Sequence, residues 1–179
     1  GAAAKEDHLN GGAGDDKFVY KATAELFDTQ ALVDDLDGGD GSETDGDAIV
    51  IRNNGLLAFA IANNDVFDTN NNTKKIERII ADAASNQDIT IALHADAHND
   101  GVQTIDLSGD TGGAGTNTVD VSAESEDLAF TITGGGHIDI ITGGAGTDII
   151  TGGAGADVLT GGGAAAKEDH LNGGAGDDK

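Results

Sequence analysis

Residues 134–160 read GGGHIDIIT, GGAGTDIIT and GGAGADVLT without a gap, and this stretch decides the fold. The nonapeptides follow the pattern G-G-x-G-x-D-x-U-x, in which U is a large aliphatic residue, except that His137 replaces the fourth-position glycine in the first of them. Glycine permits left-handed backbone and close approach of neighbouring backbone, so the first part of each unit predicts a tight turn. The aliphatic part that follows predicts a short strand with one side chain directed inward.

This pattern resembles the RTX, or haemolysin-type, calcium-binding nonapeptide repeat. The resemblance implies a parallel β-roll in which one unit forms half a coil, so residues 18 apart lie on the same side. Asp139 should then lie over Asp157, with Asp148 on the opposite side. In the family, calcium lies between stacked turns, held by Asp carboxylates and turn carbonyls. This arrangement suits a cation that takes about six to eight oxygen ligands.

Further copies of the pattern lie outside this block. A stretched copy, GGGAAAKEDHLN, follows at 161–172 with Asp169 in the acidic position, and the N-terminal GGAGDDKFV at 11–19 is complete, with Asp16 acidic and Phe18 inward. We therefore expect the roll to include both ends of the chain.

Two copies depart from the pattern. GGAGTNTVD at 112–120 has Asn117 where Asp is expected, which should weaken or abolish a calcium site there. GGDGSETDGDAIVI at 38–51 is interpreted as a repeat with an insertion, in which Asp47 is the acidic candidate and Ile49 the inward one.

The predicted cofactor is Ca²⁺, in several ions. Without a cation, carboxylates stacked coil on coil would repel each other, and the cost rises as water is excluded. The predicted metal-binding residues are the acidic repeat positions and glycines of the turns, namely Asp139, Asp148, Asp157, Asp169, Asp178, Asp7, Asp16, Asp47, Gly135, Gly144, Gly146, Gly153, Gly155, Gly12 and Gly14.

Strand-like pieces recur upstream of the regular repeats, at 89–93, 103–107, 117–121 and 130–133. The steps between successive central residues are 14, 14, 13, 9, 9 and 9, counted over Ile91, Ile105, Val119, Ile132, Ile141, Ile150 and Leu159. Such steady spacing indicates successive rungs of one β-solenoid.

Residues 21–36 and 56–88 fit this ladder poorly and should lie beside it or cap it. Residues 73–84 place several aliphatic side chains on one helical face, but IERIIA could equally be a strand, and both alternatives stay open. The fold prediction is all-β, a parallel β-roll or β-solenoid, with one short helix as an option.

We expect four regions along the chain. The first, 1–20, starts the β-roll and copies 163–179, and 21–88 contains irregular strands, the insertion and the optional helix. Looser solenoid rungs follow at 89–133, and the nonapeptide β-roll at 134–179.

Composition excludes several function classes. Acidic residues outnumber Lys and Arg by 33 to 9, which argues against nucleic acid or an anionic membrane surface as partner. With no cysteine, the chain cannot contain a disulfide framework. If the protein is extracellular, we expect bound metal ions to provide the stabilising cross-links instead. No run of 18 apolar residues is present, so we expect no direct membrane insertion, and no N-terminal signal-peptide pattern is found.

Catalytic motifs are absent from the sequence. It contains no G-x-S-x-G elbow and no P-loop, so we expect no enzymatic activity. The segment HADAH at 94–98 offers His94, Asp96 and His98 as zinc ligands, but it lacks the H-E-x-x-H spacing of a metalloprotease. We interpret it as a connecting loop.

Residues 1–17 and 163–179 are identical, GAAAKEDHLNGGAGDDK, at an offset of 162. Three explanations are considered: a tandem array with this period, an engineered or permuted chain that repeats a segment to complete both ends, and an isolated duplication. The array is favoured because long identical repeats are how solenoids grow. The expected partners are then copies of the same unit, in a covalent tandem or a head-to-tail filament.

The resulting hypothesis is a calcium-stabilised structural repeat of a bacterial extracellular protein: a fibre, surface layer, biofilm matrix or adhesin stalk. The resemblance implies type I secretion of an unfolded chain, which calcium folds outside the cell. The alternative is the calcium-dependent C-terminal module of a secreted hydrolase or toxin whose catalytic residues lie elsewhere.

Overall fold

The computed structural model describes residues 7–21, 27–28, 31–32, 35–52, 59–61, 73–82, 88–93, 97, 101–163 and 167–179. Within these residues every regular element is a β-strand, which confirms the all-β prediction. All strand pairs are parallel except one short antiparallel pair, β3 (Phe27–Asp28) with β4 (Ala31–Leu32).

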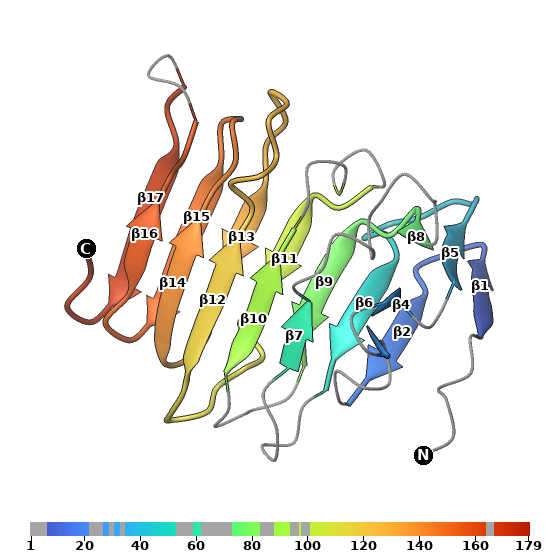
Figure 1. The fold of residues 1–179 in the computed structure, drawn as a ribbon, viewed down its shortest axis with the longest axis horizontal. Helices are drawn as coiled ribbons and strands as arrows, with labels where there is room; N and C mark the ends of the chain where they lie inside the picture. The colour runs from blue at the N-terminus through green and yellow to red at the C-terminus, as the bar shows by residue number, and fades with distance from the viewer. Residues whose placement is uncertain are drawn as a thin grey trace.

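The chain forms a parallel β-solenoid in which coils are stacked along one long axis (Figure 1). From β9 onward, successive strands alternate between two sheets, ordered β16-β14-β12-β10-β7 and β17-β15-β13-β11-β9-β6-β2. The strands of the first sheet are β7 (Phe59–Ile61), β10 (Ile89–Ala92), β12 (Thr116–Asp120), β14 (Ile138–Thr142) and β16 (Val158–Thr160). Those of the second are β2 (Lys17–Tyr20), β6 (Ala48–Ile51), β9 (Arg78–Ala81), β11 (Thr104–Asp106), β13 (Thr131–Thr133), β15 (Ile149–Ala154) and β17 (His170–Ala175).

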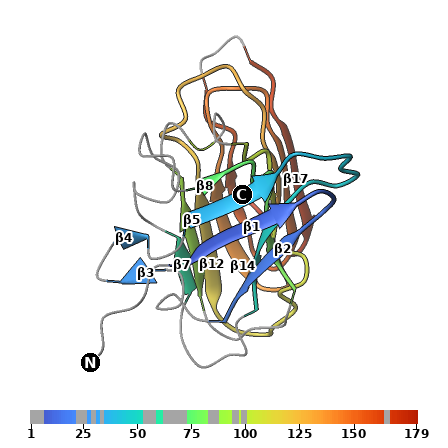
Figure 2. The ribbon, with the colours of Figure 1, turned by 90° about the vertical axis from the view of Figure 1, so that its right-hand side faces the viewer.

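A third parallel sheet is present only toward the N-terminal end. It consists of β1 (His8–Gly12), β5 (Asp35–Gly39) and β8 (Thr73–Lys74), in the order β1-β5-β8. The view along the stack shows β1 and β5 in front of the long sheets (Figure 2). The strands β1 and β17 therefore lie at opposite ends of the solenoid (Figure 1).

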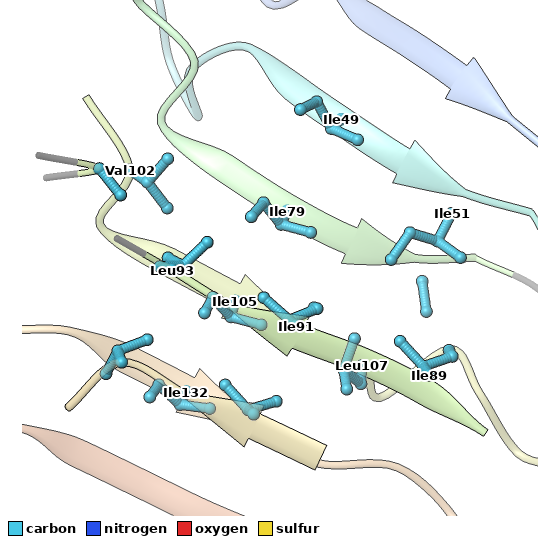
Figure 3. Packing of buried hydrophobic residues seen from close by; sticks show 14 of the residues in the cluster. Ile49, Ile51, Ile79, Ile89, Ile91, Leu93, Val102, Ile105, Leu107 and Ile132 are labelled. Atoms are coloured by element: carbon cyan, nitrogen blue, oxygen red, sulfur yellow. The ribbon is translucent and has the colours of Figure 1, made fainter. Parts of the chain in front are cut away.

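The core is a ladder of aliphatic side chains between the sheets. Alternation along each strand directs every second residue inward, as in β14, where Asp139 and Ile141 are buried and Ile138 and Ile140 are exposed. Figure 3 shows such residues in successive rungs of the seven-stranded sheet, Ile49, Ile79, Ile105 and Ile132. The predicted series of central residues is buried throughout except for Leu159, which is only partly buried in the last coil.

The segment 73–82 contains the strands β8 and β9 and no helix. β9 pairs with β6 and β11, and its burial pattern alternates as a strand requires, with Ile79 and Ala81 inward. Its apolar residues satisfy helical spacing equally well, so local pattern could not decide. Backbone pairing of β9 with a strand on each side selects the strand conformation.

Candidate metal centre

The acidic repeat positions form a ladder inside the turns of the roll. Asp139, Asp148 and Asp157 are fully buried. The backbone N–H of each donates to the carboxylate of the acidic residue in the next coil on the same side. These bonds join Asp139 N to Asp157 Oδ1 (2.9 Å), Asp148 N to Asp169 Oδ1 (2.9 Å) and Asp157 N to Asp178 Oδ1 (3.1 Å). The predicted stacking of Asp139 over Asp157 is confirmed.

One carboxylate oxygen of Asp139 and one of Asp148 face the glycine turn of their own repeat. Asp139 Oδ2 accepts the N–H of Gly135 at 2.9 Å, and Asp148 Oδ2 accepts that of Gly144 at 2.8 Å. The two repeats thus hold this turn-facing oxygen in the same way. This repetition follows from the Gly-Gly spacing four residues before each Asp. The other oxygens differ, because Asp148 Oδ1 accepts the N–H of Phe130 at 2.8 Å whereas Asp139 Oδ1 has no hydrogen-bond partner.

Four of the predicted ligands present a buried carboxylate oxygen without a hydrogen-bond partner: Asp16 Oδ2, Asp47 Oδ2, Asp139 Oδ1 and Asp157 Oδ2. A buried anionic oxygen with no donor is costly unless a cation or proton compensates it. An unpartnered carboxylate oxygen, Oδ1 in Asp139 and Oδ2 in the other three, recurs at the acidic repeat position in separate coils. These residues therefore fit a hard cation that takes oxygen ligands.

The first glycine of each repeat brings more oxygen atoms close together. A methyl group at Gly134 would lie 2.8 Å from Asp139 Oδ2 and would also collide with the carbonyl oxygen of Gly152 in the next coil. The corresponding glycines at 143 and 152 meet the same pair of groups, a carboxylate and a carbonyl. Only glycine allows this approach. The sequence prediction missed these first glycines because it placed turn carbonyls at later positions.

Comparison with known families agrees with this geometry. A family model described as the RTX calcium-binding nonapeptide repeat matches four copies in the chain, at residues 3–20, 133–165 and 164–179. These segments of the chain match the RTX repeat. Calcium is the ion that RTX nonapeptide repeats bind, and it matches the oxygen-only donor set described above. No curated protein and no solved structure matches the chain.

Predicted ligand glycines of the RTX turns fall into two groups. Gly12, Gly14 and Gly153 have φ of 101°, 105° and 109°, and Gly155 has 154°. Gly144 and Gly146 are not left-handed, nor is Gly135. The last two are held by close packing, since a methyl group at Gly135 would lie 2.7 Å from the Asp110 carbonyl oxygen and one at Gly146 would collide with that of Leu128.

Not every predicted acidic ligand is enclosed. Asp7 is exposed, Asp16 is partly exposed, and so are Asp169 and Asp178 in the last described coil. Asp178 and Asp16 are the same repeat position in two copies, and Asp16 already has its orphaned oxygen. Asp16 Oδ2 is enclosed because β2, which follows Asp16, pairs with β6 of the next coil. Asp178 lies in the last described coil, where β16 and β17 end their sheets.

The Asn117 turn differs from an RTX site, as the sequence indicated. Asn117 is buried, its Oδ1 accepts the N–H of Ile89 at 3.1 Å, and its Nδ2 lies 3.5 Å from Asp110 Oδ2. His137, which replaces the fourth glycine, places Nε2 3.6 Å from the same Asp110 oxygen. At this turn the Asn117 amide, rather than a second carboxylate, lies beside Asp110, and His137 Nε2 is buried there without a hydrogen-bond partner.

The zinc candidates His94, Asp96 and His98 lie outside the described residues. Over the residues that are described, no helix is long and apolar enough to cross a membrane.

Burial changes the acidity of the ladder. It raises the pKa of Asp139 to about 6, with the charge of Asp157 adding to the effect. Burial also raises the pKa of Asp148 and of Asp157, against the lowering effect of their backbone hydrogen bonds. Without a cation, these buried carboxylates therefore bind a proton more readily than an exposed Asp does.

The first prediction concerns pH in the absence of metal. The folded-state pKa of Asp139 lies above its ordinary value of 3.8, so the metal-free fold binds more protons than the unfolded chain. Its stability should be greatest below about pH 4 and should fall by roughly 3 kcal/mol as the pH rises through about 6. Far-ultraviolet circular dichroism in chelator measures this effect: the β-sheet signal should be larger at about pH 4.5 than at about pH 7.5.

Excess calcium should reverse the sign, because calcium binding requires ionised carboxylates. Replacing Asp139 by Asn should remove most of the pH dependence in chelator. A β-sheet signal in chelator that grows between about pH 4.5 and 7.5 would contradict the prediction.

Proposed function

We propose that the chain is a calcium-folded structural repeat and forms one period, 162 residues long, of a tandem array. The observation that carries this proposal is how the two identical segments pair. Residues 1–17 and 163–179 have the same sequence, yet their strands bond to neighbours through opposite edges. A single segment placed between both sets of neighbours would be a complete internal rung.

The first comparison concerns β1 and β17. In the second copy, the N–H of His170 donates to the Asp148 carbonyl at 2.8 Å, toward β15. In the first copy, the carbonyl of Asp7 accepts the N–H of Asp35 at 2.8 Å, toward β5. Asp7–His8 and Asp169–His170 are the same peptide unit in the two copies, and a trans peptide directs its C=O and N–H in opposite directions.

The next strand repeats this relation. Lys179 N donates to the Asp157 carbonyl at 2.9 Å, toward β16, whereas the Asp16 carbonyl accepts Ala48 N at 2.9 Å, toward β6. Asp16–Lys17 and Asp178–Lys179 are again one peptide unit. The two edges that the copies use are complementary at both strands, which supports continuation of each sheet into the next period.

The carboxylate ladder would also continue without a break. Asp157 N donates to Asp178 Oδ1 at 3.1 Å, and Asp16 N donates to Asp47 Oδ1 at 2.7 Å. Asp178 and Asp16 are one position, so superposing the copies gives Asp139, Asp157, Asp178 and Asp47 in sequence. Half-enclosed acidic sites at both ends become complete inter-coil sites.

Apolar residues at the two ends support the same arrangement. Leu171 is aligned with the buried Ile150 but is 48% exposed, and its counterpart Leu9 is 36% exposed. A pocket beside Leu171 is lined by Leu159, Gly173, Asp178 and Lys179. Covering these side chains by a following coil would remove them from water, which stabilises the joined form.

The same arrangement favours a structural role outside the cell. RTX repeat proteins are typically secreted by bacteria, and calcium supplies the charge neutralisation that this acidic chain lacks in a low-calcium cytosol. We infer export by type I secretion and use as a fibre, surface layer, biofilm matrix or adhesin stalk rather than as an enzyme. A C-terminal module of a secreted hydrolase or toxin would not need complementary edges.

A two-period chain, residues 1–179 followed directly by 18–179, tests the proposal. In calcium we expect one straight rod of about twice the single-period length in electron micrographs. The amide of Leu171 points to the edge opposite that used by His170, so its hydrogen exchange should slow at least tenfold relative to the single-period chain.

The matched control inserts a flexible Gly-Ser linker between Lys179 and the following Phe18, which leaves composition nearly unchanged but breaks the register. The control should appear as two bodies and keep fast exchange at Leu171. Two bodies and fast exchange in the directly joined chain as well would show that the periods do not continue into each other.

A further inference from the structure

Three carboxylates meet at the insertion between β5 and β6, outside the residues that the RTX repeat covers. One carboxylate oxygen from each of Glu43, Asp47 and Glu77 lies within 4.8 Å of the others. Glu43 belongs to the inserted turn, Asp47 directly precedes β6, and Glu77 directly precedes β9. We propose that these three residues form a further binding site for a hard divalent cation, calcium, in which Glu77 and Glu43 extend the carboxylate ladder beyond Asp47; this proposal rests on calcium binding by the repeats.

Asp47 supplies the observation that points to a ligand. Its side chain is fully buried, and its Oδ1 accepts the N–H of Asp16 at 2.7 Å. Its Oδ2 is buried and has no hydrogen-bond partner. Such an oxygen is costly in the fold unless positive charge compensates it. The two glutamates add further carboxylate oxygens beside Asp47 and no hydrogen-bond donor that could compensate its charge.

Glu77 is fixed in position by its neighbours. Its Oε2 accepts the N–H of Asp47 at 2.8 Å, and the register of β6 with β9 aligns it with Asp47. Gly46, at φ +85°, lies against it so closely that a methyl group would be 3.0 Å from Oε2. The sequence prediction missed Glu77 because no glycine turn precedes it in TKKIERIIA.

Glu43 completes the site from the inserted turn. Partial loss of solvent there, followed by the charges of Glu77 and Asp47, raises the pKa of Glu43. The ammonium of Lys75 forms an ion pair with Asp40, at 2.9 Å, instead of joining the three carboxylates. The insertion therefore adds an acidic group where charge is already concentrated.

The donor set favours calcium over other divalent cations. All three side chains offer oxygen, which excludes a preference for zinc or copper, and calcium tolerates irregular geometry better than magnesium does. In a regular RTX repeat the ligands are Asp carboxylates and turn carbonyls. Here two glutamates, which have a longer reach, take part, and one of them comes from an insertion.

Counting bound ions tests the site. Equilibrium dialysis with radioactive calcium, on the full chain at saturating calcium, compares the wild type with the double variant Glu43→Gln/Glu77→Gln. Glutamine keeps the size of glutamate and can still accept the Asp47 N–H. We expect the double variant to lose one bound ion per chain, with an unchanged β-sheet circular dichroism spectrum.

The matched control is Asp45→Asn, which removes one charge from the same inserted turn but lies outside the three-carboxylate cluster. It should bind as many ions as the wild type. Equal counts in all three proteins, or the same loss in Asp45→Asn, would overturn the proposal. If the double variant does not fold, the exposed single variant Glu43→Gln decides, with at least a tenfold weaker affinity for one ion as the supporting result and unchanged binding as the opposing one.

Discussion

Removing calcium with a chelator at neutral pH is expected to abolish most of the β-sheet signal of this protein, and restoring it at roughly millimolar concentration should bring back the fold cooperatively. Asp139 and Asp157 each bury a carboxylate oxygen that no protein donor contacts, while the chain has a formal net charge of −24. The metal-free roll therefore combines buried anions with repulsion along the ladder. Far-ultraviolet circular dichroism during a calcium titration measures the effect.

Magnesium at the same ionic strength is the control, because it separates specific coordination from general screening. It should restore little of the signal. A spectrum that is the same in chelator, magnesium and calcium would mean that the fold does not depend on the ion.

The second large effect is expected from Gly134→Ala. The added methyl group would collide with the backbone carbonyl of Gly152 and come within 2.8 Å of the Asp139 carboxylate. Backbone in the next coil cannot move aside as a flexible side chain can. We expect a loss of roughly 2–3 kcal/mol in the free energy of unfolding, or a melting temperature about 5–10 °C lower in saturating calcium.

Gly113→Ala is the matched control, since a methyl group there would have nothing within 4 Å. Both variants make the same chemical change in a glycine-rich turn, so helix or strand propensity does not distinguish them. Gly134→Ala should also need more calcium for half-maximal folding, whereas Gly113→Ala should match the wild type. If the two variants melt alike, close packing at the first glycine is not what positions the carboxylates.

Much of the C-terminal architecture could be predicted from local pattern. The regular repeats 134–160 specify turn, acid and inward aliphatic within nine residues each, and each short strand finds its partner one coil away. Ile141 and Ile150 are accordingly buried as expected. The ladder upstream, through Ile91 and Ile105, followed from spacing alone, because every rung needs one inward aliphatic residue.

Prediction from sequence was weaker where turns lack the glycine signature. Residues 73–84 suited helix and strand equally, and β9 became a strand because β6 and β11 pair with it on both sides. Glu77 was not recognised as an acidic rung for the same reason. The third sheet, β1-β5-β8, depends on contacts between segments more than twenty residues apart, which no local period reports.

The sequence by itself determined the repeat, the spacing of the rungs and the acidic positions, because each nonapeptide contains one turn, one acidic residue and one strand whose aliphatic side chain must be buried between the sheets. Only the tertiary structure decided which carboxylate oxygens remain without donors and that Glu43 meets Asp47 and Glu77. It also decided that the two copies of GAAAKEDHLNGGAGDDK bond through opposite edges. Those properties depend on the distance and direction of groups in adjacent coils, which are fixed only when the coils stack.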